Sequence, residues 1–152
     1  MSLLLTIVTA NAAAEATPAL DPEEVENGRA IYEQYCASCH GAKAEGAPGW
    51  REQNELGELP APPHDPEGHT WRHSDADLYA MISKGWRDPF NKTDRLTMPP
   101  FGDILTHEEI KDVIAYLKSL WTEEQRQYQR EESLEEPFPA ETTKSSMEKE
   151  HQ

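Results

Sequence analysis

The sequence contains only two cysteines and few basic residues. Its 152 residues include 14 Lys and Arg against 29 Asp and Glu, for a formal net charge of −15. This charge balance argues against a nucleic-acid partner, because phosphate binding requires Lys and Arg. It favours docking on a basic face of another protein, with an attraction that salt weakens. An acidic surface that serves solubility alone is the alternative.

Long apolar runs are also absent. The apolar stretch at residues 1–14 is too short to cross a bilayer as a helix. It ends in small residues, and both Ala10-Asn11-Ala12 and Ala12-Ala13-Ala14 fit an A-x-A cleavage site. We therefore predict a signal peptide and an exported, periplasmic protein, although no Lys or Arg precedes Leu3.

Catalytic and thioredoxin-like patterns are missing as well. No stretch alternates β-branched strands with helices, as a thioredoxin-like dithiol would require. No Ser/His/Asp set and no paired carboxylates converge on a recognisable catalytic arrangement. The sequence therefore predicts a protein that is not an enzyme.

Both cysteines lie in Cys36-Ala37-Ser38-Cys39-His40, which is the C-x-x-C-H signature of covalent haem attachment. Residues three apart share one face of a helix, so both thiols can reach one edge of a single porphyrin. His40 follows directly and can turn its imidazole toward the iron. A Cys36–Cys39 disulfide, or a zinc site that recruits a distant His, is the alternative. We predict one haem c bound through Cys36 and Cys39.

Caps and apolar spacing predict three helices. The first begins at Asp21-Pro22-Glu23-Glu24 and carries the attachment site on its buried face. The second begins at Ser74 and ends at Gly85. The third begins at the capping box Thr106-His107-Glu108-Glu109, and its apolar stripe continues to Trp121.

The remaining segments divide the chain further. Residues 41–73 and 89–101 are rich in Gly or Pro and predict loops that wrap a flat cofactor. A helical extension is expected at residues 122–136, and a disordered acidic tail at residues 137–152. The predicted haem domain thus spans residues 21–121.

The second axial ligand is predicted to be Met98. It lies in Thr97-Met98-Pro99-Pro100-Phe101-Gly102, where two prolines restrict the backbone. Met1 is the initiator, Met147 lies in the tail, and Met81 shares a helical apolar face typical of core methionines. A Met98 that only caps the core beside Phe101 is the alternative.

The sequence resembles the class I c-type cytochromes of the small bacterial monohaem type, over residues 22–121. The resemblance rests on three features in order: Cys36, Cys39 and His40 after an N-terminal helix, then Met98-Pro99, then the closing helix that ends Tyr116-Leu117-Lys118-Ser119-Leu120-Trp121. It implies an all-α fold in which three to four helices wrap one haem. It also implies His40 as proximal ligand, Met98 as distal ligand, and a helix crossing at Gly28, Tyr32 and Tyr116.

The resemblance also suggests that the Pro48 carbonyl accepts a hydrogen bond from Nδ1 of His40 and so orients the ring. The family pattern does not explain the loop that contains His64, His69 and His73. We expect a polar loop over one haem edge, with Trp71 packing on the ring or donating to a propionate. A second metal site at these histidines is the alternative.

Two propionate contacts are also expected from Trp50 and Arg51, since a guanidinium can bind a carboxylate through two hydrogen bonds. His/Met ligation leaves no open position for a substrate. The predicted function is therefore one-electron transfer between redox protein partners. The alternative is a ligand-binding or catalytic haem protein with a displaceable distal ligand.

Overall fold

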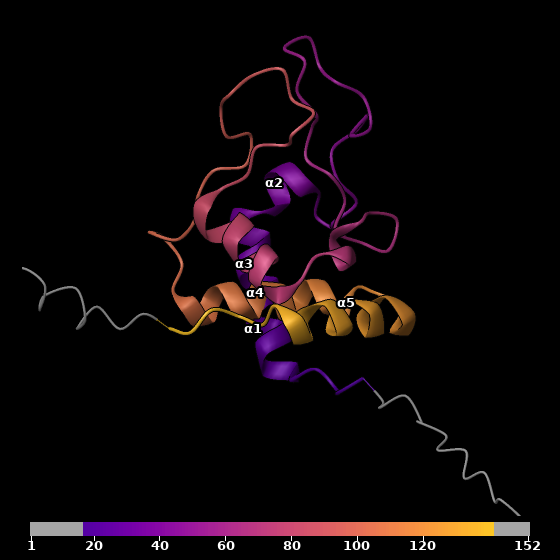
Figure 1. Cartoon of the computed structure of the whole chain (residues 1–152), viewed down its shortest axis with the longest axis vertical. Helices are drawn as coiled ribbons and strands as arrows, with labels where there is room; N and C mark the ends of the chain where they lie inside the picture. Colours follow the sequence, from indigo (N-terminus) through magenta and orange to yellow (C-terminus); the bar gives the residue numbers. More distant parts are fainter. Residues whose placement is uncertain (1–16, 142–152) are drawn as a thin grey trace, which may run out of the picture.

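The computed structural model describes residues 17–141 of the chain, and these residues are almost entirely helices and loops (Figure 1). The described residues contain no strand beyond one isolated bridge between Trp86 and Met98. In chain order the elements are α1 (Pro22–Tyr35), α2 (Ala37–His40), the 3₁₀ turn η1 (Thr70–Arg72), α3 (Asp75–Lys84), α4 (His107–Ser119) and α5 (Glu123–Glu135). The predicted all-α fold is confirmed.

The helices begin where their capping residues predict. The Asp21 side chain accepts from the Glu23 amide, and Ser74 accepts from Asp77. Thr106 and Glu109 form both halves of a capping box at the start of α4. The first helix differs from the prediction, because it ends at Tyr35, Cys36 lies between the helices, and Cys39 and His40 lie on the short helix α2.

α1 crosses α4 at a glycine. A Cβ on Gly28 would overlap the backbone carbonyl of Asp112, so only glycine allows this approach. One turn further along α1, the ring of Tyr32 packs 5.2 Å from that of Tyr116, centroid to centroid. The crossing expected from the resemblance is present. It forms the centre of the core, together with the fully buried Ile114.

α5 extends the domain beyond this crossing, as predicted for residues 122–136, and it begins at a capping box built on Thr122. It packs on η1 and α3, and Gln129 is 1% exposed at that contact. The chain does not leave the core at Pro137, because Phe138 still packs against the core cluster. The rest of the predicted tail, and the predicted signal peptide, lie outside the described residues.

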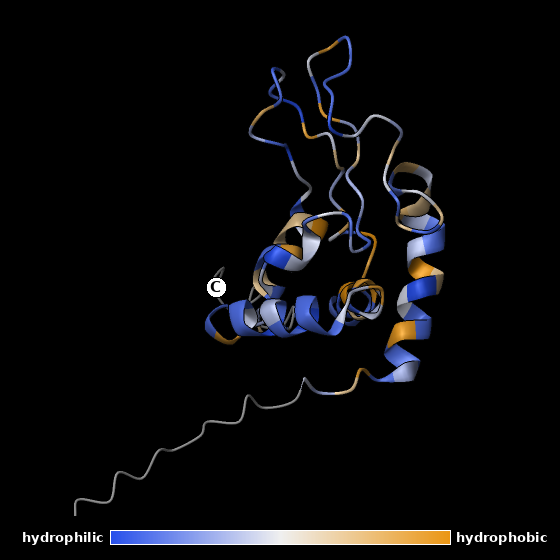
Figure 2. Ribbon diagram, turned by 90° about the vertical axis from the view of Figure 1, so that its right-hand side faces the viewer, coloured by the Kyte–Doolittle hydropathy of each residue, from blue (hydrophilic) through white to orange (hydrophobic). Residues whose placement is uncertain are grey.

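Two long loops project from the helices on the side of α2 (Figure 1). The first loop comprises residues 48–60 and the second loop residues 86–97; both are mostly hydrophilic in Figure 2, whereas apolar residues gather between the helices. Leu56 and Phe90 are exceptions, exposed by 62% and 76%. Within residues 17–141, no helix is both long and apolar enough to cross a membrane.

Candidate functional site

α2 carries Cys39 and His40 of the C-x-x-C-H motif, and Cys36 lies at its N-cap. Both Cys36 and Cys39 are free thiols, so the structure does not support the disulfide alternative. Burial, and to a lesser extent the neighbouring Cys39, raises the pKa of Cys36 to about 11. The helical conformation is interrupted at Cys36 and begins again at Ala37. Gly41 ends the short helix α2 with a φ of 85°. Tyr32 donates from its hydroxyl to the Gly41 carbonyl at 2.8 Å, which fixes α2 on α1.

His40 is buried and hydrogen-bonded through one of its ring nitrogens. It is 7% exposed, and its Nδ1 lies 2.8 Å from the carbonyl oxygen of Pro62. Because a carbonyl can only accept, Nδ1 carries the proton and Nε2 keeps its lone pair for a metal. Burial lowers the pKa of His40, although the bond to Pro62 opposes this shift, so the neutral ring is favoured.

The acceptor for His40 is therefore Pro62, and the prediction of Pro48 is wrong. The reason lies in the first loop: the Ala47 amide donates to the Ala61 carbonyl at 2.9 Å, so this loop starts and ends at the same point. Pro48 and Pro62 each follow one of these alanines. Pro48 enters an exposed turn, whereas Pro62 returns toward α2.

A second histidine lies against His40. The rings of His40 and His64 are 4.0 Å apart between centroids and 30° from parallel. His64 is held by Thr70, whose Oγ1 lies 2.7 Å from Nδ1, and by Trp121, which donates to the His64 carbonyl at 2.8 Å. Burial, followed by His40 and His69, lowers the pKa of His64 well below its ordinary value. Sequence reasoning placed His64 in a loop over a haem edge and missed this contact.

Two other residues of the His-rich loop, Trp71 and His73, contact α5. The rings of His69 and His73 meet edge to face at 5.5 Å. Trp71 donates its indole N–H to the Gly68 carbonyl at 3.1 Å, and its ring meets that of Tyr128 edge to face. The indole N–H is therefore bonded within the chain, which does not support the predicted hydrogen bond from Trp71 to a propionate. The alternative that Trp71 packs on the haem ring stays a prediction. Among residues 17–141, no group of three or more His, Cys, Asp or Glu side chains is placed to bind a metal ion.

Met98 is held by its backbone as well as by the following prolines. The Trp86 amide donates to the Met98 carbonyl, and the Met98 amide donates to the Trp86 carbonyl, both at 3.0 Å. Its side chain is half-buried and packs against the core cluster. Met81 belongs to α3 and is not among the residues of that cluster, which differs from the core position expected for it.

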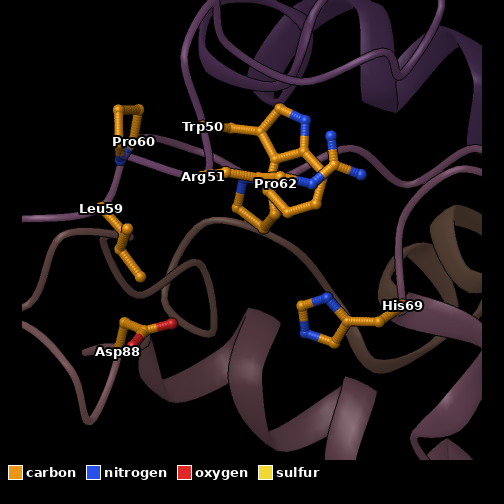
Figure 3. Close-up of a pocket in the computed structure, with 7 residues that line it drawn as sticks. All are labelled: Trp50, Arg51, Leu59, Pro60, Pro62, His69 and Asp88. Atoms are coloured by element: carbon orange, nitrogen blue, oxygen red, sulfur yellow. The ribbon is translucent and has the colours of Figure 1, made fainter. Parts of the chain in front are cut away.

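A pocket of about 250 Å³ opens between the first loop and the His-rich loop (Figure 3). The guanidinium of Arg51 stacks 4.1 Å over the Trp50 ring at one side. The side chains of His69 and Asp88 point into the pocket from opposite sides in Figure 3. Pro62 also lines this pocket, so Trp50 and Arg51 share it with the residue that holds His40.

Comparison with known proteins agrees with this geometry. Residues 25–121 match the family model for cytochrome c. The FixP subunit of cbb3-type cytochrome c oxidase from Sinorhizobium medicae is 31% identical over 106 residues, which cover 69% of this chain and 33% of that relative. The FixP subunit from Rhizobium meliloti is 32% identical with the same coverage. The chain thus spans about a third of the length of the curated relatives it matches.

Two solved structures are also similar. Cytochrome cL from Methylophaga aminisulfidivorans aligns with a TM-score of 0.45 at 24% identity, over 82% of this chain and 73% of that chain. The reducing HAO-like protein complex of Kuenenia stuttgartiensis aligns with a TM-score of 0.43 at 28% identity, over 68% and 46%. The family assignment rests on the sequence match.

The motif, the unpaired thiols of Cys36 and Cys39, and the buried His40 all fit a covalently attached haem. The family match covers the attachment site, the loop with Met98 and the α1–α4 crossing in one continuous segment. The chain belongs to the cytochrome c family, and it binds haem c through Cys36 and Cys39 for electron transfer.

Proposed function

We propose that this protein is an exported one-electron carrier whose haem iron is bound by His40 and Met98. The observation that carries the proposal is the orientation of His40, whose Nδ1 is bonded to Pro62 and whose Nε2 is left to bind iron. Met98 belongs to a different loop and is fixed through its backbone to Trp86. Two ligands held in this way need little rearrangement when the oxidation state changes.

The haem supplies the one-electron couple, and the chain sets its environment. Cys36 and Cys39 hold the porphyrin covalently. Met/His ligation raises the reduction potential relative to ligation by two nitrogens. Arg51 and Trp50 provide donors for a propionate at the pocket of Figure 3, and the guanidinium can donate two hydrogen bonds to its carboxylate.

The partner is a redox protein with a basic docking face. The net charge of −15 supports this, because opposite charges steer two proteins into contact and screening by salt slows that encounter. The named relatives are subunits of cbb3-type oxidases, and a partner within such a respiratory assembly agrees with their names.

The substitution Met98→Ala tests the ligand assignment. We expect the purified haem-bound protein to lose the far-red absorbance band typical of methionine–iron ligation and to bind carbon monoxide in its reduced form. Its midpoint potential should fall, while the haem stays attached through both cysteines. The matched control is Met81→Ala on α3, which should leave band and potential unchanged. Rapid carbon monoxide binding by the unsubstituted protein would favour the alternative of a displaceable distal ligand.

A further inference from the structure

The first and second loops project from the helices on the same side of the molecule (Figure 1). Several hydrogen bonds join them. The Lys92 amide donates to the Gly57 carbonyl at 3.0 Å. Closer to the tip, the Gln53 side chain donates to the Phe90 carbonyl at 2.7 Å. Residues nearly 40 positions apart in the chain are thereby joined, and neither loop contains a helix or strand of its own.

An ion pair between a buried carboxylate and a largely exposed guanidinium lies at the centre of this contact. Glu58 is 2% exposed, and its carboxylate accepts from Nε and Nη2 of Arg95 at 2.6 and 2.5 Å. The Thr93 hydroxyl donates to the same carboxylate at 2.5 Å. Arg95, followed by Thr93, holds the pKa of Glu58 below its ordinary value, so the carboxylate is ionised. Removing the charge of this carboxylate weakens all three hydrogen bonds and leaves the Arg95 guanidinium without its anionic partner.

An amide extends the contact toward Met98. Asn91 is 4% exposed; its Oδ1 accepts from the Leu59 amide at 2.7 Å, and its Nδ2 donates to the Thr97 hydroxyl at 3.3 Å. Thr97 directly precedes Met98. We name Glu58, Arg95, Thr93 and Asn91 the loop clasp.

The loop clasp lies close in sequence to both segments of the site. Pro62, which orients His40, follows Glu58 by four residues, and Met98 follows Arg95 by three. The loops contribute little apolar burial of their own, since Leu56, Phe90 and Leu96 are all largely exposed. Hydrogen bonds and the ion pair, rather than a hydrophobic core, therefore determine how the two loops lie.

We propose that the loop clasp is a positioning device that ties the segment of Met98 to the segment that orients His40, with Glu58 and Arg95 as its central residues. This inference rests on the proposed function, because it requires Met98 to bind iron. When the clasp is intact, the second loop cannot move away from the first, and the thioether is kept in place. When it is broken, Met98 remains on the chain, but external ligands compete with it more easily.

The test is Glu58→Gln in the purified haem-bound full chain, which keeps the shape of the side chain and removes its charge. We expect a fully loaded protein whose oxidised form binds imidazole about tenfold more tightly, the scale of losing a charge-assisted bidentate contact. The far-red methionine band should weaken in parallel, and the midpoint potential should fall. Arg95→Lys retains the charge but loses the bidentate contact, so imidazole affinity, band and potential should change in the same direction as in Glu58→Gln. The Arg95 side chain is largely exposed, so this substitution does not disturb a packed core.

The matched control is Glu108→Gln, which removes the carboxylate of an exposed ion pair with Lys111 on α4. Imidazole affinity should not change in this variant. The double variant Glu58→Gln/Arg95→Lys should have an effect smaller than the product of the single effects, because both residues act through one contact.

The experiment distinguishes failure of the proposed function from failure of the loop-clasp inference. If the unsubstituted protein lacks the methionine band, the proposed function fails and the clasp has no ligand to position. If that band is present, and both clasp variants keep it with imidazole affinity unchanged, the inference alone is overturned. A lower unfolding midpoint without any change in ligand affinity would likewise overturn it, since that is the result expected of a merely structural contact.

Discussion

The α1–α4 crossing allows a sharp prediction at Gly28. A Cβ added there would lie 1.8 Å from the carbonyl oxygen of Asp112, whereas real Cβ atoms essentially never make contacts below 3.0 Å. It would also lie 3.0 Å from Cβ of Tyr116. The helices would have to separate by about 1 Å, opening the contact around the buried Tyr32 and Ile114. Overpacking of this kind costs about 3 kcal/mol, because the obstacle is helix backbone and not a flexible side chain. Alanine regains about 1 kcal/mol of helix propensity.

Gly28→Ala should therefore destabilise the haem-bound protein by about 2 kcal/mol, or roughly 8 °C in Tm. Urea unfolding followed by circular dichroism measures the free energy. Ala30→Gly, on an exposed face of the same helix, is the control and should cost about 1 kcal/mol through propensity alone. If Gly28→Ala instead raised the unfolding midpoint, propensity would dominate and the close approach of the two helices would not be a real constraint.

Two further predictions concern the contact between α5 and the His-rich loop. Gln129→Leu should lower the free energy of unfolding by about 1–3 kcal/mol, because it leaves buried acceptors without a donor. Gln129 donates to Asp75 at 2.8 Å and to the His73 carbonyl at 3.3 Å. An unchanged midpoint of urea unfolding would contradict this prediction. Burial and His69 lower the pKa of His73, with Asp77 opposing, so the unfolded chain takes up the proton first as pH falls below about 6.5. The free energy of unfolding should therefore decline below that pH, and it should decline less in the His73→Gln variant. Equal dependence of the unfolding free energy on pH in both proteins would show that His73 does not cause the decline.

Signals that depend on a few neighbouring residues were read correctly from the sequence. The caps at Asp21, Ser74 and Thr106 predict the starts of α1, α3 and α4, because a cap acts within four residues. The C-x-x-C-H motif is equally local, and its five residues predict the cofactor. The break between α1 and α2 at Cys36 was not predicted, since apolar spacing continues through it.

Choices between similar residues required the tertiary structure. The family resemblance predicts Pro48 as the acceptor of His40, whereas the structure gives this role to Pro62. Both prolines follow alanines that the structure joins by a hydrogen bond. Only the path of the first loop decides between them. The contact of His64 with His40 follows from that decision, because His64 lies two residues after Pro62.

The sequence by itself determined the helices, the covalent haem and the family, because each depends on spacing within a short segment. The tertiary structure decided how the long loops serve that site. Glu58 and Arg95 are 37 residues apart in loops without regular structure, and nothing in either segment indicates the other. Their pairing arises because two loops without regular structure project from the helices on the same side of the molecule. Contacts of this kind depend on where the whole chain places its loops, which no local pattern encodes.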